Sequence, residues 1–383
     1  MNMKRVSAAV AGVLAGGLTL AANAGVTVFG HLDEALANTS WTHGTKTTGR
    51  KKSDTNLVCT TCSIGFKGGE DLGNGLKAIF KLDYQFDINN RNSVKPNKSG
   101  VLKGTGAITD RDQWLGLAGE NWGKIRFGTI STGYKSTGAM IDPVYRTAAQ
   151  ARAIGLQSPL HLGAGENGQG RMTNHIRYDS PSFSGFKAIV DYSLDSNGSD
   201  GGTDNAWAVT GVYKNGPILG FGSYITNGQG GKDSAWKLGG SYKFGDATVF
   251  GQYENDDGLI SEAAKLGGAN IKGECRTTIG NPACTTASNP NDAHGADVWH
   301  IGGTYAMGNN ILYAAYGHGS DVSGKNLTAV QKNTSYKTYS VIGIHVFSKR
   351  TLAYLGYVAK DNDENSLANR KMKVVALGMK HKF

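Results

Sequence analysis

Much of the chain alternates apolar and polar residues at every second position. The clearest stretch is 77–87, whose apolar positions are Ala78, Phe80, Leu82, Tyr84 and Phe86. Because side chains alternate between the two faces of a β-strand, this pattern predicts a strand with one apolar face and one polar face. Strands of soluble sandwiches also alternate, but they seldom do so over ten residues with aromatic residues gathered at one end.

The same period predicts sixteen strands. We expect them at 25–36, 60–69, 75–88, 110–119, 123–130, 171–180, 185–195, 203–214, 216–227, 234–244, 245–256, 296–307, 309–320, 335–346, 348–360 and 373–383. Near 311–316 and 339–346 both faces are apolar, so the pattern does not say which face is which.

The connections between these strands alternate in length. The short ones are Glu70–Asn74, Glu120–Trp122, Pro181–Ser184, Asn215, the 244/245 junction, Gly308 and Phe347–Ser348. The long ones are 37–59, 89–109, 131–170, 196–202, 228–233, 257–295, 321–334 and 361–372. This rhythm is typical of an antiparallel up-and-down transmembrane β-barrel with short periplasmic turns and long outer loops. A Greek-key sandwich gives no reason for it, and a propeller would show a blade repeat.

A closed sheet also explains how such strands cross a bilayer, since the hydrocarbon core offers no water to unpaired backbone groups. A barrel of sixteen strands is too wide for side chains to fill, so a water-filled interior remains. The sequence therefore predicts an all-β channel.

The first 24 residues read as a secretory signal peptide. Lys4 and Arg5 precede an apolar run from Val6 to Ala21, and Ala22-Asn23-Ala24 is a cleavage signature. We expect residues 1–24 to be removed and 25–383 to form one barrel domain. Cleavage removes two cations and no acids, which lowers the net charge from +10 to +8. No later segment has 18 consecutive apolar residues.

The chain ends in the stretch Lys373 to Phe383, which alternates and stops on an aromatic ring. Its apolar face carries Val375, Leu377, Met379, His381 and Phe383. If this strand pairs with the first strand, it closes the sheet and removes its edges. Phe383 is then expected in the aromatic girdle on the lipid side.

If the apolar face lies outside, the polar face lines water. The cationic and polar candidates for this lining are His31, Ser63, Lys67, Lys77, Lys81, Arg111, Arg126, Arg171, Arg177, Lys187, Lys237 and Lys243. Acids on this face are fewer: Asp33, Asp83, Asp87, Asp191 and Glu254. Any single lysine or arginine could simply be solvated. The set, concentrated in the second to sixth predicted strands, favours attraction of anions.

The stretch 131–170 shows no alternation, and a loop of this length inside a compact fold is usually functional or mobile. Its ends lie beside strands that carry Arg111, Arg126 and Arg171. We expect it to fold inward, face these cations with Asp142 and Glu166, and set the bore. An apolar run at Ala148–Leu156 could form a short helix, and an ordinary surface loop is the alternative.

The four cysteines of this exported chain are expected to form disulfides. Cys59 and Cys62 have the C-x-x-C spacing of redox and zinc sites, but lack the helix start or second C-x-x-C that either use requires. A local structural disulfide is favoured. Cys275 and Cys284 lie in one polar stretch and would pair with each other, although four cysteines allow three connectivities. No metal or cofactor motif is found.

Several segments together resemble the general porins of Gram-negative outer membranes, beta- and gammaproteobacterial type. They are VTVFGHLDEAL at 26–36, SIGFKGGEDLGNGLKAIF at 63–80, RDQWLGLAGENWGKIRFG at 111–128, IRYDSPSFSGF at 176–186 and ALGMKHKF at 376–383. The resemblance covers the chain from Gly25 to Phe383.

The resemblance implies a sixteen-stranded homotrimer, with 131–170 folded into each pore and small hydrophilic solutes and ions diffusing through. It also implies outer-membrane lipid, lipopolysaccharide and the barrel-assembly machinery as partners, the last through Phe383. Wall positions of the family fall on Arg111, Arg171 and His31. A wall arginine of the family falls on Ser63, so that cation is missing. The loop also lacks the family's acidic PEF-G-G-like segment.

Other functions have less support in the sequence. A substrate-specific outer-membrane channel or receptor would use loop aromatics such as Trp41 and Tyr145. An enzyme is disfavoured because no Ser/His/Asp set or carboxylate pair stands together in the sequence. An adhesin role for the long loops remains open. The sequence pI near 9.2 usually suggests nucleic-acid binding, but the signal peptide and the lack of a motif argue against that.

Overall fold

The structure is a computed structural model of the whole chain. It describes residues 25–43, 50–89, 95–96, 102–103, 108–161, 170–194, 205–226, 234–256, 292–293, 296–321, 323–325, 334–362 and 371–383. The expected signal peptide, Glu166 and the pair Cys275 and Cys284 lie outside these residues.

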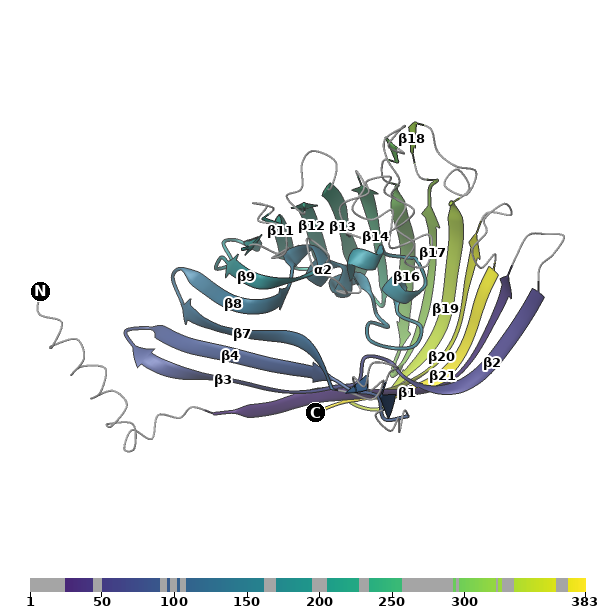
Figure 1. Cartoon of the computed structure of the whole chain (residues 1–383), viewed down its shortest axis with the longest axis horizontal. Helices are drawn as coiled ribbons and strands as arrows, with labels where there is room; N and C mark the ends of the chain where they lie inside the picture. The colour runs from purple at the N-terminus through teal and green to yellow at the C-terminus, as the bar shows by residue number, and fades with distance from the viewer. Residues whose placement is uncertain are drawn as a thin grey trace, which may run out of the picture.

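One large antiparallel sheet forms the molecule and closes on itself (Figure 1). Its strands are β1 (Thr27–His43), β2 (Arg50–Cys59), β3 (Ser63–Gly73), β4 (Leu76–Gln85), β7 (Thr109–Gly119), β8 (Gly123–Ser131), β9 (Arg171–Asp179), β10 (Phe186–Ser193), β11 (Trp207–Asn215), β12 (Ile218–Thr226), β13 (Ser234–Phe244), β14 (Ala247–Asp256), β16 (Val298–Met307), β17 (Asn310–Gly319), β19 (Tyr336–Val346), β20 (Thr351–Asn362) and β21 (Lys371–Lys382). Closure comes from β21, which pairs with β1 from His31↔Lys382 to Thr42↔Lys371.

The strand count agrees with the prediction once β2 and β3 are considered together. Both pair with β1, β3 with its first residues and β2 with its second half, so they are two parts of one strand broken at 60–62. The described residues thus form a closed barrel of sixteen strands, β2 and β3 counting as one, as predicted.

The prediction of a long loop at 37–59 is wrong. β1 continues to His43, and β2 returns from Arg50 to Cys59 as a paired strand. The alternation is lost here because this hairpin is polar on both faces. Asn38 Nδ2, for example, donates to Thr55 Oγ1 at 2.7 Å across the two strands. A strand with polar side chains on both faces shows no alternation of apolar and polar residues.

The two ends of the barrel differ as the loop lengths predicted. Short connections such as Asn74–Gly75 and 120–122 lie at the same end of the barrel as its first and last residues. Backbone bonds there join Gly30 N to Phe383 O at 3.0 Å and Phe383 N to Gly30 O at 3.1 Å. At the other end of the barrel the strands are joined by the long connections. They contain two small pairs, β5 (Lys95–Pro96) with β6 (Leu102–Lys103) and β15 (Asp292–Ala293) with β18 (Gly324–Lys325).

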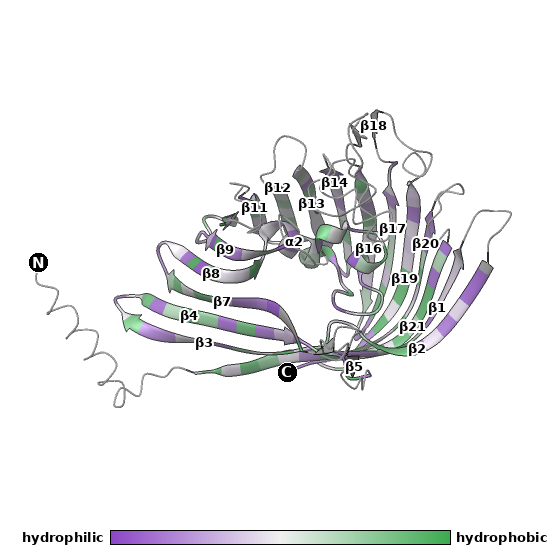
Figure 2. Ribbon diagram, viewed as in Figure 1, coloured by the Kyte–Doolittle hydropathy of each residue, from purple (hydrophilic) through white to green (hydrophobic). Residues whose placement is uncertain are grey.

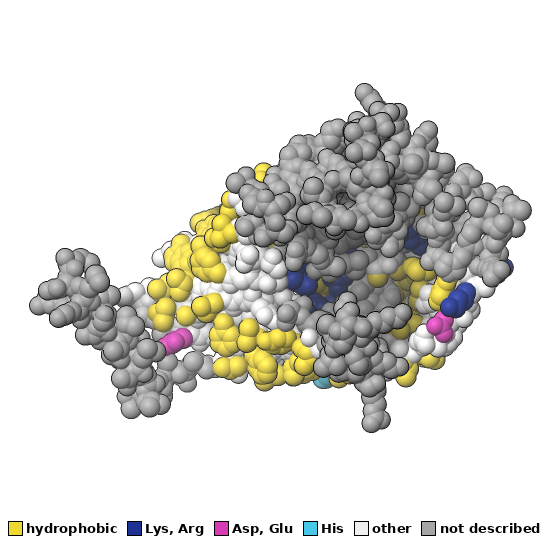
Figure 3. Space-filling model, in the orientation of Figure 1, with side chains coloured by type: hydrophobic (Ala, Val, Ile, Leu, Met, Phe, Trp, Pro, Cys, Tyr) yellow, Lys and Arg dark blue, Asp and Glu magenta, His cyan; other side chains and the backbone are white. Residues whose placement is uncertain are grey.

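The outer face of the barrel is apolar. Leu115, Ile301 and Leu377 are 63%, 60% and 58% exposed, whereas Ala376 beside Leu377 is 1% exposed. Figure 2 shows this as hydrophobic and hydrophilic bands along the strands, and Figure 3 shows hydrophobic side chains spread over the outside. Such an apolar surface is typical of contact with lipid. Among the described helices, none has the length and apolarity to cross a bilayer.

The segment after β8 folds into the barrel and lies across its interior (Figure 1). It contains α2 (Gly133–Gly138) and three 3-10 turns, η1 (Ala139–Ile141), η2 (Ala151–Ala153) and η3 (Pro159–His161). We call the described part, residues 132–161, the constriction loop. The expected helix at 148–156 is therefore only the single turn η2, which is followed by Gly155 with φ +84°.

The constriction loop explains why β17 and β19 are apolar on both faces. Tyr313 and Ile342 point inward, where they form one core with loop residues such as Ile154. Leu312 and Val341, one position before each of them, are about half exposed on the outside. The protein core thus lies between the loop and the inner wall, and the opposite side of the barrel is left for polar groups.

Candidate pore constriction

The first anchor of the constriction loop is the start of α2. Thr132 accepts a hydrogen bond from Lys135 N through its side chain, which caps the helix. The Gly133 N–H donates to Asp191 Oδ2 on β10 at 2.8 Å. A Cβ at position 133 would lie 2.5 Å from Thr210 Oγ1, so only glycine permits this close approach to the wall.

The second anchor is a buried polar group on β13 and β14. Glu254 accepts hydrogen bonds from Tyr134 Oη at 3.0 Å and Ser158 Oγ at 2.6 Å. Lys237 Nζ lies 2.8 Å from His161 Nε2. Burial, together with Lys237, holds the pKa of His161 well below its usual value, so the ring is neutral and its Nε2 accepts from the lysine.

This anchor brings together a serine, a histidine and a glutamate, which the sequence alone did not suggest. All three are fully buried, and the Ser158 hydroxyl donates to the carboxylate while His161 Nε2 faces Lys237. A hydrolytic triad needs an accessible hydroxyl beside a histidine free to take its proton. Ser158 Oγ also lies 3.3 Å from His161 Nδ1, but its hydroxyl is buried and bonded to Glu254, so the group serves here as an anchor for the loop.

The third anchor holds the middle of the loop. Asp142 accepts from Val144 N at 3.1 Å and Ala151 N at 2.9 Å, which closes the segment between them. Burial raises the pKa of Asp142 to about 6. From the wall, Tyr354 Oη accepts from Ala148 N at 3.1 Å and donates to Asp33 Oδ1 at 3.1 Å, and Lys380 Nζ donates to the Tyr145 carbonyl.

A first group of cations lies on β4, β7 and β9. Asp83 is opposed by two consecutive residues of β7, Arg111 and Asp112, because the register shifts between Leu82 and Tyr84. This β-bulge turns both side chains inward. Lys81 lies 3.2 Å from Asp83 and 3.8 Å from Asp112, and Arg171 Nε lies 2.8 Å from Asp112.

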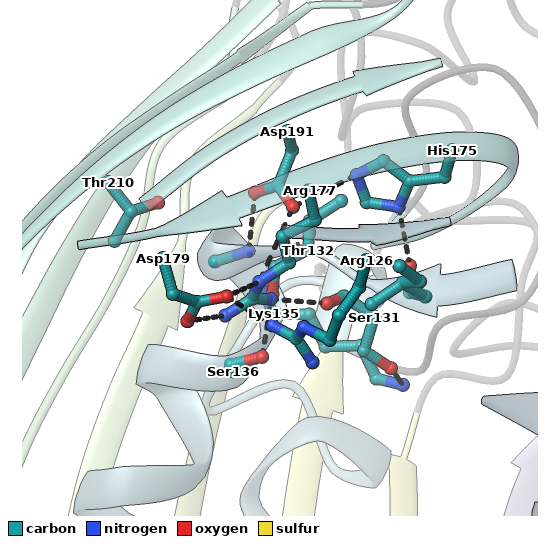
Figure 4. Close-up of polar contacts among 12 residues, drawn as sticks. Arg126, Ser131, Thr132, Lys135, Ser136, His175, Arg177, Asp179, Asp191 and Thr210 are labelled. Carbon is teal, nitrogen blue, oxygen red and sulfur yellow. Dashed lines mark hydrogen bonds and ion pairs between the residues drawn. The ribbon is translucent and has the colours of Figure 1, made fainter. Parts of the chain in front are cut away.

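A second group surrounds Asp179 at the end of β9 (Figure 4). Arg177 binds its carboxylate through Nε and Nη2, both at 3.0 Å, and Arg126 pairs with the same carboxylate. Lys187 from β10 adds a contact at 3.0 Å. Asp179 is thus shared by three cations.

A third group joins β1 to the constriction loop. His31 contacts Thr61 Oγ1 at 3.3 Å through Nε2, and Ser63 Oγ at 3.1 Å through Nδ1. Arg146 Nη1 lies 3.3 Å from His31 Nδ1. The loop therefore presents a guanidinium to this wall.

Comparison with known proteins decides the family. A family model described as Gram-negative porin matches residues 7–365. The chain belongs to this family. Over 374 residues it is 26% identical to the major outer membrane protein P.IB of Neisseria meningitidis serogroup B, an alignment that covers 96% of each chain. Other curated relatives are matched over 39–53% of their own length.

Solved structures of porins share the fold. An anion-selective porin from Comamonas acidovorans superimposes with a TM-score of 0.63 at 20% identity, covering 94% of this chain and 100% of that one. A trimer form of OmpT from Vibrio cholerae gives 0.60 at 14% identity, covering 94% and 99%. This porin is accordingly an outer-membrane protein and forms a channel through that membrane.

The candidate residues of this porin fall into two sets. His31, Ser63, Lys81, Arg111, Arg126, Arg171 and Arg177 meet around the constriction loop, with Lys187 at the edge of the second group. Lys77 and Lys243 are exposed beside short turns, whereas Lys67 is exposed opposite Lys81 on the neighbouring strand. Asp87 is exposed beyond the end of β4, and Lys237 is fully buried in the second anchor.

The contacts of Asp142 differ from those expected from the sequence. Its carboxylate serves backbone N–H groups of its own loop and does not face Arg111 or Arg171. The acids that meet the wall cations are Asp83, Asp112 and Asp179. Of these, Asp112 and Asp179 were not among the candidates. Neither was Arg146, whose φ of +62° lies in a loop without periodicity.

Proposed function

We propose that this porin is a general diffusion channel for small hydrophilic solutes and ions with a mild preference for anions. The observation that carries the preference is the sharing of carboxylates by several cations. Asp179 serves Arg126, Arg177 and Lys187, and the two carboxylates of Asp83 and Asp112 serve Lys81, Arg111 and Arg171. Each of the two groups therefore keeps a surplus of positive charge.

A surplus of this kind acts most strongly where the channel is narrow. Fixed charges in a passage with low-dielectric walls raise the local concentration of counter-ions. The Debye length at physiological salt is about 8 Å. Charges at the constriction therefore act on passing ions more strongly than Lys77 and Lys243, which are exposed beside the short turns. Figure 3 shows lysine and arginine side chains in the hollow near the centre of the view.

The relatives support two parts of this proposal. The Comamonas acidovorans porin is described as anion-selective and the Vibrio cholerae porin as a trimer form. We extend both to this chain as a mildly anion-selective homotrimer. Removal of residues 1–24, contact with lipopolysaccharide and delivery by the barrel-assembly machinery through Phe383 complete the proposal. Passive diffusion involves no catalytic step, so we assign no enzymatic activity.

Liposome swelling tests the proposal. Purified protein in liposomes is challenged with a neutral sugar and with an anionic and a cationic solute of similar size. We expect swelling with all three, fastest with the anion and slowest with the cation. No swelling with any solute, or fastest entry of the cation, contradicts it.

The alternative, a substrate-specific channel, would need the aromatic candidates to converge. Trp41 pairs with Met372 near the outer end of β21, whereas Tyr145 contacts Lys380, eight residues further along that strand. At about 3.4 Å per residue, these levels are roughly 27 Å apart. Trp41 and Tyr145 are therefore associated with different levels of β21, which gives no support for one shared aromatic site. Block of conductance by a single solute at low concentration would favour the alternative.

A further inference from the structure

The break between β2 and β3 is held by a disulfide between Cys59 and Cys62, as the sequence predicted, with Cα atoms 5.8 Å apart. Glu34 of β1 is opposite Cys59, and His31 is opposite Ser63. Between these pairs β1 has two residues and the other strand has three. The disulfide therefore encloses a β-bulge in the channel wall.

The backbone of this bulge is restricted to few conformations. Thr61 has φ +54°, a left-handed conformation that β-branched residues rarely adopt. Thr60 N donates to Asp33 O at 3.1 Å, and Asp33 N donates to Cys62 Sγ at 3.4 Å. Cys62 is fully buried. The disulfide joins the two ends of the bulge and so limits where Thr61 can lie.

The bulge is connected to the constriction through a short series of contacts. Thr61 Oγ1 and Ser63 Oγ hold the two ring nitrogens of His31 at 3.3 and 3.1 Å. His31 Nδ1 then lies 3.3 Å from Arg146 Nη1 of the constriction loop. Arg146 also lies over the Tyr145 ring, 5.5 Å from its centroid. The disulfide thus determines the wall against which this loop arginine rests.

We propose that the Cys59–Cys62 disulfide is a positioning element of the constriction, which sets the place of Arg146 and thereby part of the anion preference. This inference rests on the proposed anion selectivity. A purely structural disulfide would affect folding and thermal stability only. A positioning disulfide also changes the permeability ratio of folded channels.

The test compares the wild type with the double variant Cys59→Ser/Cys62→Ser, both purified as folded barrels, in a KCl gradient across a planar bilayer. We expect the anion-to-cation permeability ratio of the variant to fall about two-fold, since one cation of the constriction loses its fixed place. Incubating the wild type with a phosphine reductant reproduces the fall, and the reductant leaves the variant unchanged. Reduction of the folded wild type also serves if the variant does not fold.

A second comparison distinguishes an effect on the position of Arg146 from an effect on the stability of the barrel. Arg146→Ala lowers the ratio in the wild type, and we expect a clearly smaller effect of the same substitution in the double-serine background. A folded variant with the wild-type ratio, or additive effects of the two changes, overturns the inference. A wild type without anion preference refutes the proposed function instead, so the two failures are distinct.

Discussion

At the scale of single residues, Arg111 shows how the wall acquires its charge. The β-bulge opposite Asp83 turns Arg111 inward together with Asp112. Its Nη1 donates to Gln85 Oε1 at 2.7 Å, and its Nε lies 3.5 Å from Asp83. These two partners fix a guanidinium at the edge of the constriction.

Arg111→Ser should therefore lower the anion-to-cation permeability ratio, by about two-fold, because it removes one fixed charge from the narrow passage. The matched control is Lys243→Ser, an exposed lysine near the turn end, which should leave the ratio unchanged. Reversal potentials in a salt gradient measure both. Equal effects of the two substitutions would show that position along the channel does not matter.

The raised pKa of Asp142 predicts that the anion preference of the channel depends on pH. Its pKa is raised to about 6, so the carboxylate is ionised at pH 8 and mostly neutral at pH 5. Losing a negative charge beside Arg152 and Lys380 should raise the anion preference at the lower pH. Asp142→Asn should show the higher preference already at pH 8 and a flatter profile between pH 8 and pH 5. An identical pH profile in the variant would refute this role.

Where strict alternation holds, as at Arg126 and Arg177, sequence reasoning assigned the arginines to the inner face, and both side chains lie buried beside Asp179. It missed Asp112 because a bulge puts two neighbours on one face, which a period of two cannot show. It missed Arg146 because the conformation of the constriction loop depends on distant contacts, such as that with His31. The electrostatic partners of a predicted cation were therefore harder to identify than the cation itself.

At the scale of elements, the constriction loop depends on its anchors to the wall. Glu254 accepts hydrogen bonds from both Tyr134 and Ser158, two residues of the constriction loop. Leaving a buried hydrogen-bonding group without its partner typically costs about 1–3 kcal/mol. A cost of that size would favour states in which the loop leaves the wall.

Glu254→Gln should therefore increase the open-channel current noise and lower the thermal midpoint of the barrel. Glu70→Gln, an exposed residue next to a short turn, is the control and should change neither. Single-channel recording and thermal unfolding give the two readouts. A quiet channel of unchanged stability in Glu254→Gln would mean that the loop is held by its apolar core alone.

The elements themselves were predictable to different degrees. The rhythm of short and long connections identified the barrel because it reflects chain topology. The hairpin of β1 and β2 was not found because it lies beyond the apolar band and is polar on both faces. The inward faces of β17 and β19 were ambiguous in the sequence because the constriction loop makes them part of a protein core.

At the scale of the whole molecule, the last residue extends the strand pair that closes the barrel. Phe383 makes two backbone hydrogen bonds with Gly30, and a Cβ at Gly30 would lie 2.6 Å from the Phe383 ring. The terminal ring therefore packs on the strand that it joins and remains partly exposed on the outside.

Deleting Phe383 should reduce the amount of folded trimer in the outer membrane far more than the conductance of the channels that do form. The reason is that the deletion removes the last bonds of the closing strand pair. Phe347→Ala, an exposed aromatic residue in the turn between β19 and β20, is the control and should assemble normally. Quantifying folded trimer by gel mobility without heating decides the outcome, and normal trimer levels in the deletion would contradict the role.

The proposed function is that of a water-filled channel whose constriction favours anions. Planar-bilayer recording of the purified protein in a KCl gradient tests it most directly. We predict discrete conductance steps and a reversal potential displaced toward the chloride equilibrium potential. The absence of steps, or a reversal potential on the potassium side of zero, would contradict the claim.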